Sequence, residues 1–598
     1  MPRIDTLSGD FRIISRLFEF LIKINKIMRI SIHLKEDVMK KFLLVVVSFV
    51  LIVFFSGCSK DKKSKDDSDV IESDNDTESV DGDESILDED VSYPDSIEPD
   101  LEEQDIEEQD GAVEPDEIET DDDPEDYDED TFDRFANVIC VAVTGNDNTG
   151  DGTVAAPFAT IGKAIAVAVD GKEIYVSAGE YNEALTINKD NIKIIGGFNE
   201  DFADGGLYSS DMIGAGEENI TKIISTEESV VTFDGTLDNF LFEGFVVEST
   251  RDTGHASSAI TVKSGSPEIA QNTLIGGNPE GSLMGALSGS LSAGLVIGGG
   301  SPVIHNNRII AGEAVDNFTT IGTPTAASIG IVIGEISSIG AESSVNTEIY
   351  NNIIIAGHSK DEGTDGGNVG IGVYRNNGDV KIHGNIISAG ENKYKARSYG
   401  VLLSKNTGIV LYNNIIHGGK STDLTAGIYF YDSTTAKVFN NTLDCGESTM
   451  TTTAVKFSGK YSSPELRNNL LFCVNDDNPV YEFNTNQITP FAPVFENNVI
   501  VGGSTGVTIM GTQNSSDSLY KSATNIYLPS KTVADIGFVN YVDGSLYYAN
   551  DLHLTADSKD IDGNDITTAG SDLSEIFIKD KDGKTRTVPW SAGAYELD

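Results

Sequence analysis

Residues 411–416 read Leu-Tyr-Asn-Asn-Ile-Ile, and variants of this six-residue phrase occur eight times between residues 269 and 500. The second Asn is present in every copy, with an apolar residue three positions before it and Ile or Leu two positions after it. These anchoring asparagines are 27 to 45 residues apart, and a repeat of this length predicts a solenoid of stacked units. They are Asn272, Asn307, Asn352, Asn385, Asn414, Asn441, Asn469 and Asn498.

Short runs of alternating apolar residues around each anchor indicate β-strands rather than helices. A second strand precedes each phrase, as in Gly400-Val-Leu-Leu and Gly427-Ile-Tyr-Phe. One such unit cannot bury its own apolar face, but stacked units bury it jointly, with neighbouring strands about 4.8 Å apart. We expect the anchoring asparagines to lie inward and to hydrogen-bond one another as a ladder, because an unpartnered buried amide costs about 1–3 kcal/mol. The alternative is a β-sandwich with eight ordinary Asn-Asn turns.

The repeat resembles the right-handed parallel β-helix of the pectin-lyase-like superfamily, over roughly residues 137–598. The resemblance implies an all-β solenoid with caps, because an uncapped stack exposes strand edges. Apolar residues at helical spacing from Pro157 to Val169 predict a helix that covers the first coil. The sequence from Trp590 to Glu596 resembles the closing segment of such proteins, although Ser591-Ala592 departs from it. We expect an N-terminal cap and first coils over residues 135–250, repeats over 251–510, and C-terminal coils and a cap over 511–598.

Residues 39–58 are typical of a secretory signal, with Met-Lys-Lys, an apolar stretch from Phe42 to Phe55 and then Ser-Gly-Cys. The Cys after Ser-Gly resembles the lipobox of bacterial lipoproteins, which implies that Cys58 is lipidated and anchors the chain in a membrane. Ser59 resembles the residue of outer-membrane-directed lipoproteins, so a lipid-anchored position at the cell surface is expected. Residues 1–38 are then interpreted as an upstream extension assigned in error. The alternative is an uncleaved membrane anchor with an incidental Cys.

Residues 59–134 are strongly acidic, with 36 Asp and Glu against four Lys between Ser59 and Asp133, a net charge of −32 out of −55 for the chain. Such a segment cannot support a core and is predicted to be a disordered, extended tether. The acidic balance argues against nucleic acid as a partner. No cofactor is predicted; Ca²⁺ collected by mobile carboxylates is the alternative.

Cys445 and Cys473 stand at the same position of adjacent repeats, each four residues after its anchoring Asn. Equivalent Cα atoms in neighbouring coils lie about 4.8 Å apart, within the range that a disulfide accepts. The two residues are therefore either bridged, as an oxidising compartment would allow, or stacked as small apolar side chains.

No catalytic or metal-ligating residue is predicted. The repeat strands carry no Asp-Asp pair, no Gly-His-Gly and no Arg-Ile-Lys, which mark the pectin-hydrolysing branch of the superfamily. Asp361, Glu362 and Asp365 lie in a Gly-rich loop that is interpreted as a solvated turn. His305 and His383 share one repeat position, with Tyr350 between them in the stack, and are interpreted as surface residues rather than as a catalytic pair.

Aromatic and charged residues near the ends of the preceding strands form a candidate glycan-contact patch, because rings stack on sugars and charges bind hydroxyls or carboxylates. The patch consists of Tyr374, Arg375, Lys405, Tyr429, Tyr431 and Asp432. The sequence thus favours a surface-anchored β-helix lipoprotein with a structural, adhesive or glycan-binding role, whose partner is a polysaccharide or a surface protein. The alternative is a polysaccharide lyase or glycoside hydrolase acting on an extracellular or cell-wall polysaccharide.

Overall fold

The computed structural model describes residues 135–597 except for 204–218, 281–289, 316–325, 335–341, 361–366, 393–396, 432–433, 459–462, 475–477, 485–492, 504–506, 512–522, 530, 542–549, 560 and 562. The chain divides into two units, residues 1–123 and 124–598, and every described residue belongs to the second. The predictions for Cys58, for the signal and for the acidic tether fall on residues outside the described part. Among the described residues, no helix is long and apolar enough to cross a bilayer.

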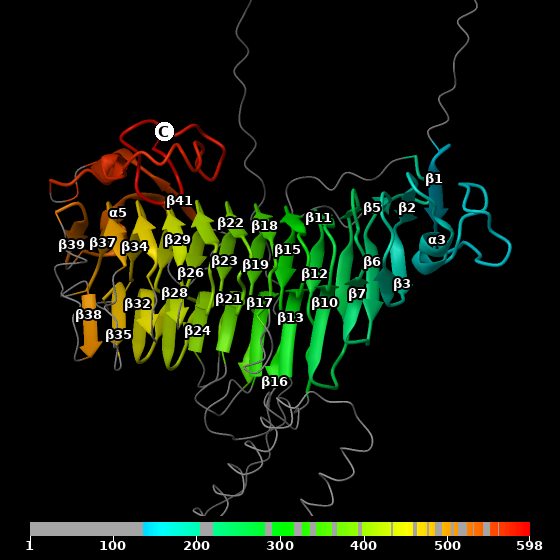
Figure 1. Ribbon diagram of the computed structural model, residues 1–598, viewed down its shortest axis with the longest axis horizontal. Helices are drawn as coiled ribbons and strands as arrows, with labels where there is room; N and C mark the ends of the chain where they lie inside the picture. Colours follow the sequence, from blue (N-terminus) through cyan, green and yellow to red (C-terminus); the bar gives the residue numbers. More distant parts are fainter. Residues whose placement is uncertain are drawn as a thin grey trace, which may run out of the picture. The chain divides into compact units, whose positions relative to one another are not determined.

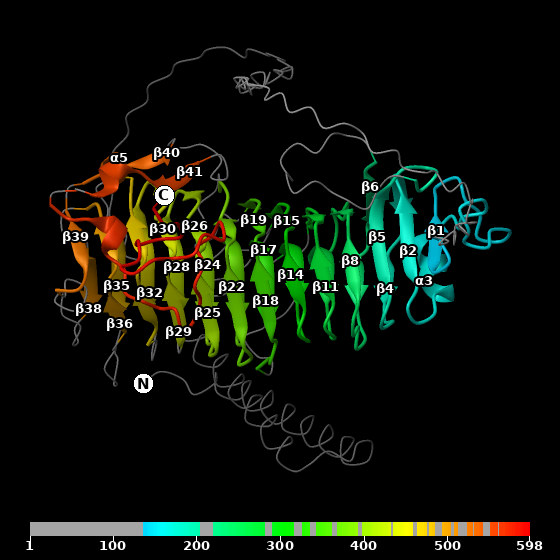
Figure 2. The same cartoon turned by 90° about the horizontal axis from the view of Figure 1, so that it is seen from above.

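Three long sheets of parallel strands form most of the second unit, and each complete coil of the chain adds one strand to each sheet (Figure 1). Sheet 1 has 12 strands, in the order β1 (Val138–Val141), β2 (Glu173–Ser177), β5 (Lys193–Phe198), β8 (Leu241–Glu243), β11 (Glu268–Ala270), β14 (Val303–His305), β18 (Thr347–Tyr350), β22 (Val380–His383), β25 (Ile409–Tyr412), β29 (Ala436–Phe439), β33 (Glu465–Arg467) and β36 (Val494–Glu496). Figure 2 shows this sheet from its outer side.

Sheet 2 follows sheet 1 in every coil, and sheet 3 completes the coil. Sheet 2 has 12 strands, in the order β3 (Gly179–Asn182), β6 (Thr221–Ser225), β9 (Val246–Ser249), β12 (Thr273–Ile275), β15 (Arg308–Ile310), β19 (Ile353–Ile355), β23 (Ile386–Ser388), β26 (Ile415–His417), β30 (Thr442–Asp444), β34 (Leu470–Phe472), β37 (Val499–Val501) and β39 (Ile526–Leu528). Sheet 3 has 11 strands, which are β4 (Leu185–Ile187), β7 (Ser229–Phe233), β10 (Ala256–Val262), β13 (Ser290–Ile297), β17 (Ala326–Gly334), β21 (Gly367–Tyr374), β24 (Arg397–Ser404), β28 (Leu424–Tyr431), β32 (Thr451–Ser458), β35 (Val480–Asn484) and β38 (Val507–Gly511).

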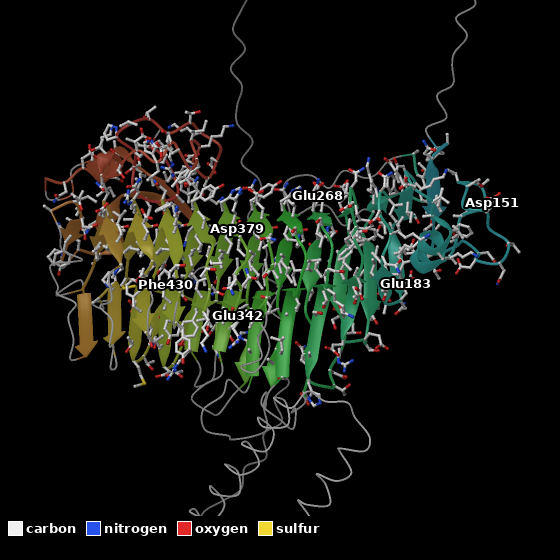
Figure 3. The ribbon with its side chains drawn as sticks, viewed as in Figure 1. Asp151, Glu183, Glu268, Glu342, Asp379 and Phe430 are labelled. Carbon is white, nitrogen blue, oxygen red and sulfur yellow. A yellow bond between two sulfur atoms is a disulfide. The ribbon has the colours of Figure 1, made fainter. Side chains whose placement is uncertain are left out.

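This arrangement is a right-handed parallel β-helix, which confirms the predicted fold class. Parallel strands of one sheet need a crossover between them, and such crossovers are almost always right-handed. Inward side chains stack in register from coil to coil, as Ile382, Leu411 and Val438 do in sheet 1. Phe430 lies fully buried inside the coil, with its ring stacked on Phe457 at 5.2 Å (Figure 3). The apolar residues that alternate along the repeat are therefore the residues that form the core.

The anchoring asparagines form a continuous buried ladder at the turn between sheet 1 and sheet 2. The main-chain N and Nδ2 of Asn414 donate to Oδ1 of Asn441 at 3.0 and 2.9 Å, and Nδ2 also donates to the carbonyl of Ile382 at 2.8 Å. The same bonds to the next Oδ1 join all eight asparagines from Asn272 to Asn498. Each buried amide is thus satisfied by the coil above and the coil below.

A ninth rung and a second ladder of asparagines are present that the repeat did not predict. Main-chain N and Nδ2 of Asn498 donate to Oδ1 of Asn525 at 2.8 and 3.3 Å, but Asn525 lacks both the preceding Asn and the Ile or Leu that follows the other anchors. At the turn between sheet 3 and sheet 1, main-chain N of Asn376 donates to Oδ1 of Asn406 at 3.0 Å, and both residues are fully buried. Two residues in separate coils form too short a repeat to be noticed in the sequence.

The residue before each anchoring Asn turns the chain from sheet 1 into sheet 2. These residues have positive φ angles between 50° and 65°, a left-handed conformation that Asn and Gly tolerate better than other residues. We name them the corner row. It comprises Gln271, Asn306, Asn351, Gly384, Asn413, Asn440, Asn468 and Asn497.

Cys445 and Cys473 form a disulfide between adjacent coils, with their Cα atoms 4.9 Å apart. Both side chains lie in the interior beyond β30 and β34. The third described cysteine, Cys140, is buried and unpaired. Each bridged cysteine follows its anchoring Asn by four residues, so the two cysteines lie one above the other in adjacent coils.

Helix α3 (Ile161–Val167) packs Ile161, Ala164 and Ile165 into the core at the N-terminal end of the stack. It is shorter than the predicted helical stretch, because Thr160 caps it by accepting a hydrogen bond from the N–H of Lys163. The Glu183 carboxylate accepts hydrogen bonds from the first two N–H groups of the helix, those of Ile161 and Gly162, at 2.8 and 3.0 Å. The predicted cap helix is thus present, but it begins four residues later.

The C-terminal segment, residues 531–597, lies along the side of the last coils, over the outer face of sheet 2 (Figures 1 and 2). Ile536, Leu554 and Ile566 pack there against Phe472 and Val501. Its elements are α5 (Val533–Ile536), β40 (Phe538–Asn540), β41 (Asp551–Leu554), η2 (Ala556–Lys559) and η3 (Ile566–Thr568). Three further short pairings involve β16 (Ala314–Val315) with β20 (Ser359–Lys360), β27 (Lys420–Ser421) with β31 (Glu447–Ser448), and β40 with β41. We call residues 531–597 the tail.

Candidate functional site

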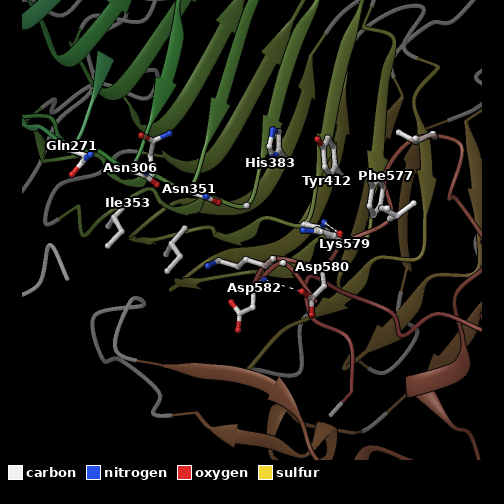
Figure 4. A pocket seen from close by; sticks show the side chains of 18 residues that line it. Gln271, Asn306, Asn351, Ile353, His383, Tyr412, Phe577, Lys579, Asp580 and Asp582 are labelled. Carbon is white, nitrogen blue, oxygen red and sulfur yellow. Dashed lines mark hydrogen bonds between the residues drawn. The ribbon is translucent and has the colours of Figure 1, made fainter. Parts of the chain in front are cut away.

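A groove of about 1020 Å³ lies between the corner row and the tail loop formed by residues 576–583 (Figure 4). Gln271, Asn306 and Asn351 line it from the corner row, and Ile353 and Ile386 line it from the starts of β19 and β23. His383 and Tyr412, at the ends of β22 and β25, also line it, and Tyr412 lies beside Phe577 of the tail loop. The groove is therefore lined by side-chain amides, aromatic rings and apolar residues, and on the tail loop also by the charged residues 579–582.

The tail is hydrogen-bonded to the second half of the corner row. Amide donors from successive coils bind backbone carbonyl oxygens of the tail. The bonds run from Nδ2 of Asn413 to Lys579 at 2.6 Å, of Asn440 to Ser591 at 3.0 Å, of Asn468 to Ser571 at 2.7 Å and of Asn497 to Ala569 at 3.4 Å. Asn413, Asn440 and Asn468 are buried as a result, whereas Asn351 is exposed. The first half of the row is thus the accessible part.

Five rings form a stack beside the corner row. His305, Tyr350, His383 and Tyr412 occupy one outward position of successive strands, with ring centroids 4.8, 5.2 and 4.6 Å apart. Phe577 of the tail continues the stack on Tyr412 at 4.6 Å. Neighbouring rings in the stack cover one another's faces. The rings therefore expose mainly their edges and polar atoms to the groove. Burial raises the pKa of Tyr412 to about 12, which keeps its hydroxyl protonated and able to donate at neutral pH.

The two histidines of the stack are held by glutamates of the adjacent row. Nε2 of His305 lies 2.9 Å from Glu268 Oε1, and its Nδ1 lies 3.1 Å from Nδ2 of Asn306. Nε2 of His383 lies 3.1 Å from Glu348 Oε1. Burial lowers the pKa of His383 more than Glu348 raises it, so this ring is neutral at pH 7. The two histidines do not contact each other, because the Tyr350 ring lies between them.

The carboxylates of the tail loop are already engaged. Oδ1 of Asp580 accepts hydrogen bonds from the N–H groups of Asp582 and Lys584 at 3.0 and 2.8 Å, and its Oδ2 accepts from the N–H of Glu596 at 3.0 Å. Oδ2 of Asp582 lies 2.8 Å from Nε2 of His553, whose Nδ1 lies 2.5 Å from Asp551. Asp580 therefore shapes the loop, and Asp582 ties it to β41.

Lys579 is an exposed cation at the groove. Its side chain is exposed, and it has no ion-pair partner within the described part of the chain. The neighbouring Lys581 lies over the ring of Tyr595 at 5.7 Å, and burial lowers the pKa of its ammonium. Lys579 is thus the cation that a ligand in the groove would meet first.

The predicted glycan-contact patch is less exposed than expected. Arg375 and Lys405 do stand one coil apart at one repeat position, because Tyr374 pairs with Ser404. The Tyr374 ring, however, lies over Gly372, where no side chain fills the space, and belongs with Tyr429 to an apolar cluster on the outer face of sheet 3. Tyr431 remains 45% exposed. Asp432 lies outside the described residues, as do Asp361, Glu362 and Asp365.

Tyr429 is enclosed by its neighbours. Its ring lies 4.9 Å from that of Tyr399 and 5.8 Å from that of Tyr431, and the Lys456 ammonium lies 4.8 Å from its centroid. Burial lowers the pKa of Lys456 to about 8. The patch therefore offers one well-exposed ring where three were expected.

The groove was not predicted from the sequence. Two signals were present: the first Asn of the repeated phrase, and the alternation of His and Tyr at one repeat position. The position of the tail had no signal, because its contacts with the corner row join residues more than 100 positions apart in three of the rungs. In the part of the chain that the structure describes, no group of three His, Cys, Asp or Glu side chains could hold a metal ion.

The structure is similar to several solved parallel β-helix proteins at low identity. The pectate lyase Pel9A is 14% identical, with a TM-score of 0.41, over 77% of this chain and 96% of that chain. A rhamnogalacturonan lyase is 14% identical, with a TM-score of 0.32, over 71% and 97% of the two chains. The Dettilon tailspike protein is 12% identical, with a TM-score of 0.35, over 66% and 68%. No protein-family model and no curated protein matches the sequence. Similarity at this level carries no argument for an activity, and the fold stands on its own sheet topology.

Proposed function

We propose that this chain is a lipid-anchored β-helix protein that binds a glycan in the groove between the corner row and the tail loop. The observation that carries the proposal is the lining of that groove: amides of Gln271, Asn306 and Asn351, the edges of His383 and Tyr412, and the exposed Ile576 and Ile578. Planar amides and hydroxyls hydrogen-bond sugar hydroxyls, while apolar side chains contact the C–H faces of sugar rings.

The anchor in this proposal is Cys58, which follows an apolar segment and Ser-Gly. The acidic residues 59–134 would extend from the lipid surface by mutual repulsion and present the β-helix outside the outer membrane. The partners are then a membrane through the lipid, and a polysaccharide through the groove. A Cys58→Ala variant should lose incorporation of labelled fatty acid and should leave the outer-membrane fraction; an unchanged distribution would contradict the anchor.

Binding is favoured over catalysis because the acidic and basic groups around the groove are hydrogen-bonded to other groups of the chain. Most glycoside hydrolases need two carboxyl groups beside the glycosidic bond, one as acid and the other as base or nucleophile. In the described residues the Asp580 carboxylate accepts three main-chain hydrogen bonds, and Asp582 is paired with His553. His305 has both ring nitrogens engaged. These groups support the loop rather than a reaction.

A glycan array on the full-length protein in detergent tests the proposal, with two double variants. Ile576→Ser with Ile578→Ser changes exposed residues of the groove wall and should weaken glycan binding at least tenfold. Tyr429→Ala with Tyr431→Ala changes the patch on sheet 3 and should leave binding unchanged. Loss of binding only in the second variant would move the site to sheet 3. Release of unsaturated sugar ends or of new reducing ends by the wild type would favour the lyase or hydrolase alternative.

A further inference from the structure

We infer that the ligand of the groove is an N-acetylated glycan, whose acetamido carbonyl oxygens accept hydrogen bonds from Nδ2 of Asn306 and Asn351. The inference rests on the proposed glycan binding and names the class of sugar. It follows from what the corner row already binds within this chain.

The hydrogen bonds between the tail and the corner row show which kind of acceptor the row binds within this chain. Four successive row members, from Asn413 to Asn497, each donate from Nδ2 to the carbonyl oxygen of a peptide group, at 2.6 to 3.4 Å. The peptide group is a secondary amide, and so is the acetamido group of an N-acetylated sugar. The two present the same carbonyl acceptor, which is stronger than a hydroxyl or ether oxygen. The row is therefore a series of donors matched to amide carbonyls.

The accessible half of the row offers the same donors without the tail. The side chain of Asn351 is exposed and makes no hydrogen bond with any described residue. Nδ2 of Asn306 lies next to Nδ1 of His305 at 3.1 Å, which leaves its second proton available. The two residues belong to adjacent coils, because their neighbours Ile304 and Ile349 are paired in register. Adjacent coils are about 4.8 Å apart, so a single oligosaccharide can contact both amides.

Apolar residues line the groove together with the amides of Asn306 and Asn351 and supply contacts for an acetamido methyl group. Ile353 begins β19 two residues after Asn351, and Ile386 begins β23 in the next coil; both are partly exposed and line the groove. Ile578 of the tail loop is 54% exposed on the opposite side. An acetamido group thus meets an amide donor for its oxygen and apolar side chains for its methyl group.

A peptide is a poorer occupant of this part of the row. Extended peptides usually bind by adding a strand to a free sheet edge. Here the corner backbone is already used between coils: main-chain N of Asn306 donates to Tyr350 O, that of Asn351 to His383 O, and that of Gly384 to Tyr412 O, each at 3.3 Å. A peptide would gain bonds to its carbonyls and leave its N–H groups without backbone partners, whereas a sugar chain has no such requirement.

The test compares oligomers of N-acetylglucosamine and of glucose, of equal length and linkage, by calorimetry with the full-length protein in detergent. Both ligands are uncharged, so the net charge of the protein does not bias the comparison. The acetylated oligomer should bind at least tenfold more tightly. An Asn306→Gly, Asn351→Gly double variant should lower its affinity to that of the glucose oligomer. Glycine suits these positions because both have a φ of 54°.

The matched control is Asn239→Gly, which changes an exposed asparagine with a φ of 53° outside the groove and should leave both affinities unchanged. Equal binding of the two oligomers by the wild type would overturn the inference and leave the proposed function standing. A preference that survives in the double variant would overturn the assignment to the corner row. Failure to bind either oligomer or any array glycan would overturn both proposals. Binding of a synthetic peptide of residues 569–593 in place of the glycans would overturn the inference in favour of a peptide ligand.

Discussion

Asn413 donates from Nδ2 to the carbonyl oxygen of Lys579 at 2.6 Å, across 166 residues of sequence. Its Oδ1 accepts a hydrogen bond from Nη2 of Arg586 at 2.8 Å, so both ends of one amide are held by the tail. Arg586 is itself buried and paired with Glu596 at 3.0 Å. Asn413 is therefore the boundary between the covered and the accessible parts of the corner row.

Replacing a middle rung of the Asn ladder should destabilise the β-helix. Asn414→Ala removes the acceptor of the main-chain N and Nδ2 of Asn385, and the donor to Ile382 O. Each buried group left without a partner costs about 1–3 kcal/mol. We expect a clear fall in the denaturant midpoint, measured by circular dichroism. The control is Asn351→Gly, which removes an exposed amide at a position where the next coil already has Gly384; an equal loss of stability in both variants would contradict the ladder's role.

Releasing the tail should leave the coils folded. Asn413→Gly removes the bonds to Lys579 and Arg586 without straining a residue whose φ is 53°. We expect faster amide exchange and faster proteolysis in residues 569–597, with unchanged exchange in β18 and β22. Mass spectrometry of the fragments locates the effect. Unchanged protection of the tail would show that its apolar contacts with sheet 2 hold it alone.

Attachment of the tail loop should weaken as pH rises above about 6.5. Partial burial alone would lower the pKa of His553, but hydrogen bonds to Asp551 and Asp582 outweigh burial and raise it. A raised folded pKa contributes stability that is fully present below the unfolded value of about 6.5, and that is lost as pH rises through the folded value. Exchange of residues 576–583 should therefore speed up across that interval, beyond the intrinsic effect of pH.

A His553→Gln variant is the control for this effect, because glutamine keeps a hydrogen-bonding side chain without the charge. The extra pH dependence of the tail loop should disappear in it. Persistence of the same dependence in the variant would assign it to another group.

Breaking the disulfide should lower stability without opening the fold. Cys445 and Cys473 close a loop of 28 residues, for which the chain-entropy model gives about 3–4 kcal/mol. A Cys445→Ala, Cys473→Ala double variant should unfold at lower denaturant concentration, yet keep the β-sheet circular dichroism spectrum. Addition of reductant should destabilise the wild type and leave the double variant unaffected. An effect of reductant on the variant would point to a different target.

The sequence predicted the β-helix because its decisive contacts repeat. Ile382, Leu411 and Val438 pack on equivalent residues one coil away, so the same choice of residue is needed in each unit and appears as a period. The Asn ladder and the position of Cys445 over Cys473 follow from that same register. The candidate patch was predicted less well, since exposure depends on neighbours: Gly372 admits the Tyr374 ring, and Tyr399 shields Tyr429.

Only the tertiary structure decided where the groove lies. The corner-row asparagines look alike in sequence, but the tail covers Asn413, Asn440 and Asn468 and leaves Asn306 and Asn351 accessible. The tail packs there through irregular contacts such as Phe577 on Tyr412, which occur once and follow no period. Contacts between equivalent positions of a repeat require the same residue type in every unit, so they appear in the sequence as a period. A single long-range contact depends on shape and burial, which only the folded chain defines.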